Sequence, residues 1–574
     1  MQNPTALFVR TTAVALFAGA ILGGCDAPTA PGARASARDG GPSMLITPEC
    51  AGPGGQVHAG GSITTAQTWA RSDSPHRVTG NIVVNAGGRL TIAPGVTVCF
   101  EPGTGVYADA GRVVARGRDT ARILFTARDP AHGWTGFSFH GSTAASSYLT
   151  NVRIEYVNWV YVAVQTADQH PVYVDSSVIR QSGRAVEFGS PGSRFIRSRV
   201  DTTTYRSFPA VKLATGSLER SVVRGAAGVG VQVVGPGVLL LGGRIEGSGG
   251  VGLQVSNLTL SGASQPVRIV GGRSHAAEMS VTMLARLYPT PAEQDSLRGN
   301  ASDSIIVWGG TLRSQLTVDA RLPLRVLYGI NVDSAGTLVA RPGARMIFEM
   351  DGGILATNGG RLLSRGTAAA PVLFAPDDPA AGWTGLRFEG SAASTSYLTN
   401  TRIERTALSY AAVSATDNHR VILDSTVVRL AGLGVFLLSP GSRLSRSRVD
   451  STLNSMHPAV HLASNALLES TLIRASAGPG LVVVGPQVVV ASCEVRDGDD
   501  DGIRLFYPVT VSRCNMINNR GVGLRDVING PTATATGNWW GSTGGPMGAG
   551  GDGVAGQVNY TPWRTTPYVL PYVP

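Results

Sequence analysis

Two long stretches of this chain of 574 residues repeat each other at one constant distance along the sequence. The sequence Gly-Trp-Thr-Gly at 133–136 returns at 382–385, and Ser-Tyr-Leu-Thr-Asn at 147–151 returns unchanged at 396–400. Both pairs are 249 positions apart. A constant offset leaves little room for insertions, so both stretches must build the same structure. We therefore predict an internal tandem duplication of about 249 residues.

A shorter period runs inside each repeat. Short apolar strands begin at Val178, Val200, Val222 and Ile245, a spacing of about 22 residues that suits a stacked repeat. Turns rich in Gly, Ser and Asn separate them. A unit of this length without a helix cannot bury its apolar face alone and must stack on its neighbours. The pattern of leucine-rich repeats is missing, and a propeller blade needs roughly 40–50 residues. The period predicts an all-β parallel solenoid of roughly 20 coils.

Five segments indicate the type of solenoid. Residues 88–98 and 336–343 look like the opening coils of bacterial right-handed parallel β-helix proteins of the surface type, which have pectin-lyase-like folds. The Gly-Trp-Thr-Gly strands and the terminal Gly-Asn-Trp-Trp-Gly-Ser-Thr-Gly-Gly-Pro at 537–546 resemble the same group. The resemblance implies a right-handed parallel β-helix. It says little about chemistry, because such helices carry lyases, hydrolases, epimerases and adhesins.

The start of the chain, at 1–25, has the features of an export signal. Arg10 precedes an apolar run at 11–22 that is too short to span a bilayer. The run ends in Leu-Gly-Gly-Cys at 22–25, which resembles a bacterial lipobox. The resemblance implies a lipoprotein signal peptide that is cleaved before Cys25, and lipidation of that cysteine. An ordinary secretory signal with an incidental cysteine is the alternative. We expect an exported protein of the bacterial cell envelope, lipid-anchored to a membrane surface.

Composition and the repeat divide the chain into six parts. The segment after the signal is rich in Pro, Gly, Ala and Ser, which is typical of a flexible tether. The expected parts are the signal peptide (1–25), the tether with an N-terminal cap (26–56), the first repeat (57–256), a connecting segment (257–304), the second repeat with the coils that follow it (305–530), and a C-terminal cap (531–574).

The connecting segment breaks the strand pattern. Residues 276–288 and 291–297 are expected to form two short helices, and Pro291 suits the first turn of the second. A packing spacer is the favoured role, and a lid over the junction is the alternative.

Four cysteines besides Cys25 are candidates for disulfides, which an exported protein permits. Cys493 and Cys514 are one coil apart in the sequence, and they share a phase. Stacked strands would bring their Cα atoms to about 4.8 Å, within the range of a disulfide. Cys50 is a candidate partner for Cys99. Buried free thiols are the alternative for both pairs.

One acidic segment occurs in the second repeat only. Residues 497–502, Asp-Gly-Asp-Asp-Asp-Gly, match the first half of a calcium loop, with Asp497, Asp499 and Asp501 as candidate ligands for Ca²⁺. The twelfth position of such a loop is a bidentate Glu, whereas this chain has Pro508. A solvated acidic turn is the alternative. The first repeat has Gly247, Gly249 and Val251 at these positions.

Aromatic side chains are candidates for glycan contact. Trp159, Tyr161 and Tyr173 lie near one another in the first repeat, whereas the second repeat has Leu408, Tyr410 and Ile422 at the same offsets. A carbohydrate platform would therefore be confined to the first repeat. The tryptophans that recur in both repeats, Trp134 and Trp383, are better interpreted as core or cap residues.

The net charge and the absence of known catalytic motifs limit the classes of function that we expect. The net charge is +10 and forms no basic run, so we expect no nucleic-acid partner, and acidic glycans suit the charge better. Carboxylates beside the strand starts fall on alternate coils, about 9.6 Å apart, too far for one Ca²⁺ to bridge. The motifs of serine hydrolases, zinc proteases and P-loop enzymes are missing, and no catalytic residue is predicted.

We predict a membrane-anchored protein of the cell envelope that binds polysaccharide or surface proteins without evident catalysis. A polysaccharide lyase or glycoside hydrolase acting in a groove along one sheet is the alternative from another class. A purely structural stalk is a third.

Overall fold

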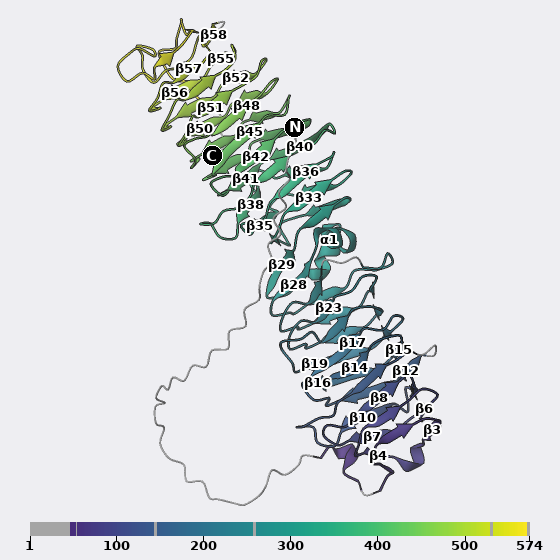
Figure 1. The fold of residues 1–574 in the computed structure, drawn as a ribbon. Coiled ribbons are helices and arrows are strands. Elements are labelled where there is room, and N and C mark those ends of the chain that lie inside the picture. Colours follow the sequence, from purple (N-terminus) through teal and green to yellow (C-terminus); the bar gives the residue numbers. More distant parts are fainter. Residues whose placement is uncertain (1–45, 53, 143–145, 257–259, 529–531, 571–574) are drawn as a thin grey trace, which may run out of the picture. The chain divides into compact units, whose positions relative to one another are not determined.

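Most coils in the described part of the chain contribute one strand to each of three parallel ladders. The computed structural model describes residues 46–52, 54–142, 146–256, 260–528 and 532–570. In one coil, β13 (Val152–Glu155), β14 (Val162–Thr166) and β15 (Val172–Asp175) belong to three different sheets. β13 pairs in parallel with β10 (Ile123–Ala127) before it and β16 (Val178–Ser182) after it. The prediction of an all-β parallel solenoid is confirmed, with about 21 turns (Figure 1).

Five sheets arise in this way. Sheet 1 has 10 strands, from β1 (Val57–His58) to β27 (Arg268–Val270), and sheet 3 has 8, from β3 (Ala66–Trp69) to β24 (Leu239–Leu241). Sheets 4 and 5 have 11 strands each and begin at β30 (Gly310–Leu312) and β31 (Gln315–Val318). Sheet 2 runs through both repeats, from β2 (Gly61–Ile63) to β56 (Asn515–Ile517). β2 pairs with β5 (Ile82–Val84) and β56 with β53 (Glu494–Arg496).

The core is a stack of apolar side chains inside the coils. Alternate residues of β15 are buried and half-buried, as a strand with one face inward requires. The tryptophans of the two Gly-Trp-Thr-Gly motifs are fully buried. Trp134 stacks on Phe100 with ring centroids 4.0 Å apart, and Trp383 stacks on Phe348 at 4.4 Å. Their indole N–H groups donate to the Glu155 and Glu404 carbonyls, so no polar atom of either ring is left without a partner.

Short helices fill the junction between the repeats. α1 (Val281–Leu287) begins after Ser280, whose hydroxyl accepts a hydrogen bond from the Met283 amide. α2 (Pro291–Gln294) has Pro at its first position and continues into the 3-10 helix η3 (Asp295–Leu297). The side chains of α1 are largely buried, as expected of a packing spacer.

The helix expected over 276–279 is wrong, because these residues lie in the strand β28 (His275–Met279). β28 pairs with β26 (Leu253–Val255) and β29 (Ser302–Val307), which give its backbone hydrogen-bonding partners on both sides. Ala276, Ala277 and Met279 are buried there, while Glu278 is half-buried. Burial of these side chains inside the coil therefore outweighs the local helix propensity.

Across the junction, the sequence repeat shifts by one sheet relative to the solenoid. β13 lies in sheet 1, but β41 (Thr401–Glu404), the equivalent strand of the second repeat, lies in sheet 2. Similarly, β14 of sheet 2 corresponds to β42 (Ala411–Ala415) of sheet 4. The shift arises because the chain leaves β28 through the two helices and re-enters the same sheet at β29. Equivalent residues of the two repeats therefore belong to different sheets of the solenoid.

Candidate functional site

Exposed and half-buried apolar side chains gather at one corner of the first repeat, where the chain turns from sheet 1 to sheet 2. We call Trp159, Val160, Tyr161, Tyr205 and Phe208 the corner patch. The exposed fractions of Trp159 and Phe208 are 57% and 40%. Trp159 and Tyr205 meet edge to face with ring centroids 5.4 Å apart, and Tyr205 stacks on Phe208 at 5.0 Å. Three rings on two turns thus form one surface.

A polar turn holds Trp159 outward. The Asn158 side-chain oxygen accepts a hydrogen bond from the Val160 amide at 3.1 Å, and the Asn158 carbonyl accepts one from Tyr161 at 3.0 Å. Gly183 on the next coil leaves room for this turn, because a Cβ there would lie 2.4 Å from the Trp159 carbonyl oxygen. The Trp159 turn therefore rests directly on the backbone of the following coil.

Three charged side chains border the corner patch. The Arg184 guanidinium lies over the Phe208 ring, 4.9 Å from its centroid, and donates to the Val160 carbonyl at 3.2 Å. Arg184 also pairs with Glu187 at 3.2 Å, and Lys212 pairs with the same carboxylate at 2.9 Å. The patch therefore combines exposed ring surface with a carboxylate that two cations already neutralise, which suits binding better than proton transfer.

Tyr173 does not belong to this patch. It lies in β15 of sheet 3, and the chain crosses sheet 2 through β14 between Tyr161 and Tyr173. Tyr173 stacks on Tyr148 with centroids 5.3 Å apart, and Arg194 and Arg116 lie over the outer sides of the pair at 6.0 and 4.1 Å. The expectation that Trp159, Tyr161 and Tyr173 lie together is wrong, because it took nearness in sequence for nearness around a coil.

Sequence reasoning missed Tyr205, Phe208 and Arg184. Tyr205 follows Trp159 by two coils, and that spacing alone would have placed the two rings at the same corner.

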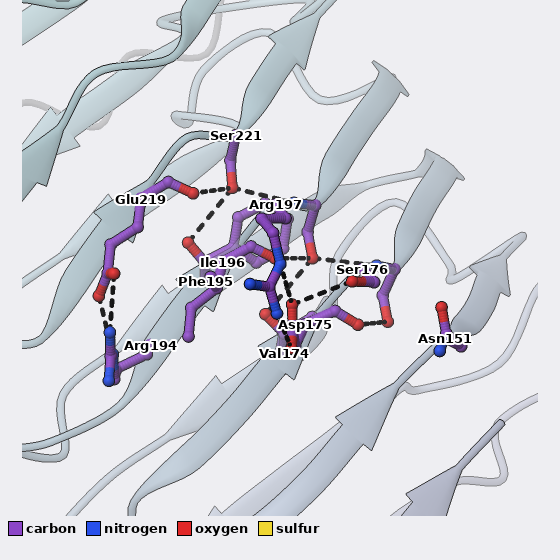
Figure 2. Close-up of polar contacts among 12 residues, drawn as sticks. Asn151, Val174, Asp175, Ser176, Arg194, Phe195, Ile196, Arg197, Glu219 and Ser221 are labelled. Carbon is purple, nitrogen blue, oxygen red and sulfur yellow. Dashed lines mark hydrogen bonds and ion pairs between the residues drawn. The ribbon is translucent and has the colours of Figure 1, made fainter. Parts of the chain in front are cut away.

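Arginine–carboxylate pairs and serines stack between neighbouring coils where sheet 3 turns into sheet 1 (Figure 2). Arg194 makes two bonds of 2.7 Å to Glu219, and Arg197 donates to Asp175 at 2.6 and 3.2 Å. Hydrogen bonding to Arg194 lowers the pKa of Glu219. Behind these pairs the Ser177 amide donates to the Ser198 hydroxyl at 3.0 Å. These contacts tie one coil to the next.

Cys493 and Cys514 occupy that serine position near the end of the second repeat. The Cys493 amide donates to the Cys514 sulfur, and the Cys514 amide donates to the Asn538 side-chain oxygen at 2.7 Å. The two sulfur atoms are 2.6 Å apart and both thiols are free and buried. The contact with Cys514 and burial raise the pKa of the Cys493 thiol. The predicted stacking on adjacent coils is present, whereas the bond between them is not formed in this structure.

Cys50 and Cys99 are joined by a disulfide whose Cα atoms are 5.9 Å apart. It ties the 3-10 helix η1 (Pro48–Cys50) to β7 (Thr97–Phe100) of sheet 1. Both half-cystines are buried. Cys25, the predicted lipidation site, lies outside the described residues.

Arginines surround the acidic segment of the second repeat. Asp501 is buried and pairs with both Arg504 and Arg525 at 2.7 Å. Burial acts to raise the pKa of Asp501, but Arg525, the Val522 amide and Arg504 together lower it to about 2. Asp499 pairs with Arg520 at 3.1 Å. Within the described segments, no group of three or more His, Cys, Asp or Glu side chains is arranged to hold a metal ion.

Two comparisons with known proteins bear on the family. Residues 384–539 match the family model described as the right handed beta helix region. The search of curated proteins finds no match. None of the described helices has the length and apolar character needed to cross a bilayer. The matched segment lies inside the ladders described above, and the coils of the second repeat that precede it are built from strands of the same three sheets. The chain is therefore a right-handed parallel β-helix repeat protein.

Proposed function

We propose that this β-helix protein binds glycans at the corner patch of the first repeat and carries out no catalysis there. The observation that carries the proposal is the exposure of Trp159, more than half of which is open to solvent beside the rings of Tyr205 and Phe208. Exposed rings of this kind stack on the apolar faces of sugars while polar neighbours bond the hydroxyl groups. Arg184, Glu187 and Lys212 supply such groups at the edge of the patch.

The pairing of Glu187 supports binding without catalysis. A glycosidase needs two carboxyl groups about 5–10 Å apart across the scissile bond, one of them with a raised pKa. Both carboxylate oxygens of Glu187 are already paired, Oε2 with Arg184 and Oε1 with Lys212, so this side chain is not a free acid or base beside the patch.

The cellular setting is part of the same proposal. Residues 1–25 with Cys25 support export and lipid anchoring, and the tether that follows would hold the β-helix away from the membrane surface. In that setting the glycans within reach are those of the cell envelope or its surroundings.

A panel of neutral and acidic polysaccharides tests the proposal by isothermal titration calorimetry. Trp159→Ala should lower glycan affinity by about fivefold, because a ring contact contributes roughly 1 kcal/mol. Leu408→Ala is the matched control, since Leu408 occupies the equivalent corner of the second repeat with the same exposed fraction, 57%. Equal affinity of wild type and Trp159→Ala would contradict glycan binding at this patch. Release of unsaturated uronides or reducing ends would contradict the absence of catalysis.

A further inference from the structure

A hollow lies next to the corner patch, at the same turn from sheet 1 to sheet 2 but on the following coils. Its volume is about 330 Å³. Arg206 and Arg273 line it, and small residues that include Ala227, Gly247 and Gly249 lie between them. We call this the arginine hollow. Arg206 directly follows Tyr205 of the corner patch in the chain, so the two surfaces adjoin.

Both arginines of the hollow lack a counter-charge. Arg206 and Arg273 are exposed, and neither makes an ion pair or a side-chain hydrogen bond within the described residues. Glu246 precedes Gly247, but it pairs with Arg224 at 2.8 Å and Arg244 at 2.7 Å. The hollow is therefore a concave surface with two uncompensated positive charges, which is the character of an anion site.

In the second repeat, the arginine equivalent to Arg273 has a partner. Arg273 lies three residues after β27, and Arg520 lies three residues after β56. Gly249 and Asp499 likewise each lie three residues after a strand, β25 (Arg244–Glu246) and β53. Their amides donate to the preceding coil at 2.8 Å in both repeats. In the second repeat Asp499 pairs with Arg520 at 3.1 Å, so a carboxylate of the chain itself fills the site.

The first repeat cannot supply that carboxylate. A Cβ at Gly249 would lie 2.1 Å from the Ala227 carbonyl oxygen, so the backbone there admits only glycine without moving. The first repeat also has Arg206 where the second has Ser455, each seven residues after the start of its strand, β19 (Arg199–Thr203) and β47 (Arg448–Asp450). It therefore gains a positive charge and loses the negative one.

From this difference we infer that the arginine hollow binds the carboxylate group of an acidic sugar. This inference rests on the proposed function, because the adjoining rings of Tyr205 and Phe208 are what favour a glycan over an acidic peptide. A uronate-bearing chain would stack on the corner patch and place a carboxylate where Asp499 lies in the second repeat. The net charge of +10 favours the approach of such a chain.

Calorimetry with a hexuronate oligosaccharide, its neutral hexose analogue and a glutamate-rich peptide tests the inference. The double variant Arg206→Gln/Arg273→Gln should lower uronate affinity by about tenfold or more and leave affinity for the neutral analogue unchanged. Uronate binding by the wild type should weaken with added salt. Arg520→Gln is the matched control, because Asp499 already neutralises Arg520, and it should bind the uronate as the wild type does. The double variant should fold normally, since neither side chain has a partner to lose within the described residues.

The outcomes separate the two proposals. If Trp159→Ala weakens binding of both sugars while the arginine variant keeps the full uronate preference, glycan binding stands and the arginine hollow is refuted. If the peptide binds in an arginine-dependent way and the uronate does not, the ligand class is wrong. If no sugar binds the wild type, the proposed function fails and the inference fails with it.

Discussion

The Cys493 amide donates a hydrogen bond to the sulfur of Cys514, 3.3 Å away on the next coil. The same bond is made to oxygen elsewhere, since the amides of Ser177 and Thr426 donate to the hydroxyls of Ser198 and Ser447. The thiol of Cys514 therefore serves as the acceptor that closes one step of a ladder between coils. Its neighbour Cys493 stays protonated, because the contact and burial raise its pKa.

Serine should replace Cys514 with little loss, whereas valine should not. Cys514→Ser keeps an acceptor for the Cys493 amide, but Cys514→Val leaves that buried N–H without a partner, at a cost of about 1–3 kcal/mol. Amide hydrogen exchange around Cys493, followed by mass spectrometry, reads this local cost directly. Equal protection in the serine and valine variants would show that the sulfur is not an acceptor.

A buried histidine should make the fold sensitive to acid. His419 is fully buried, and its Nε2 lies 2.9 Å from the Ser396 hydroxyl. Burial lowers the pKa of His419 to about 4, below its ordinary 6.5. The neutral form therefore stabilises the folded chain fully above pH 6.5, and this contribution is lost as the pH falls from 6.5 to 4.

His419→Gln tests this, because glutamine is polar and does not titrate. The melting temperature of the wild type should fall between pH 6.5 and 4, and that of the variant should fall less. His170 occupies the same place in the first repeat and burial lowers its pKa too, so the double variant His170→Gln/His419→Gln should be flatter still. Parallel curves for all three proteins would contradict the assignment.

Asp501 should contribute to stability through its arginines. Its carboxylate is buried and pairs with Arg504 and Arg525. Asp501→Asn leaves Arg525 without its ion-pair partner, whereas Arg504 keeps Asp500, so we expect a cost of about 1–3 kcal/mol. Asp499→Asn is the control, because Asp499 is largely exposed and an exposed pair contributes at most about 1 kcal/mol.

Calcium should not raise the melting temperature of this region, since arginines already neutralise the acids. Differential scanning calorimetry of the wild type in EDTA and in excess Ca²⁺ checks this. A rise with Ca²⁺ that Asp501→Asn abolishes would instead support the calcium loop that the sequence suggests.

The period of the sequence was enough to predict the solenoid, because each strand start recurs after one coil. It also placed Cys493 and Cys514 on neighbouring coils. The period did not predict that Tyr173 lies in a different sheet from the corner patch. The number of residues between two positions gives the distance along a coil but does not say which sheet each residue belongs to. The shift by one sheet at the junction was hidden for a related reason, because it depends on how α1 and α2 pack. The pairing of Asp501 with Arg525 could have been predicted from the sequence, because Arg525 follows Asp501 by about one coil.

Gly183 gives a last test of the corner patch that leaves its side chains intact. A Cβ at this position would lie 2.5 Å from the Trp159 Cα, so Gly183→Ala should displace the Trp159 turn and lower glycan affinity about as much as Trp159→Ala does. Gly432→Ala is the matched control, because its Cβ would lie 2.5 Å from the Leu408 Cα at the equivalent corner of the second repeat. Both alanine variants should lose similar stability, since both strain the same turn, and only Gly183→Ala should lose glycan binding. Equal glycan affinity in the two variants would show that the glycan does not bind at Trp159.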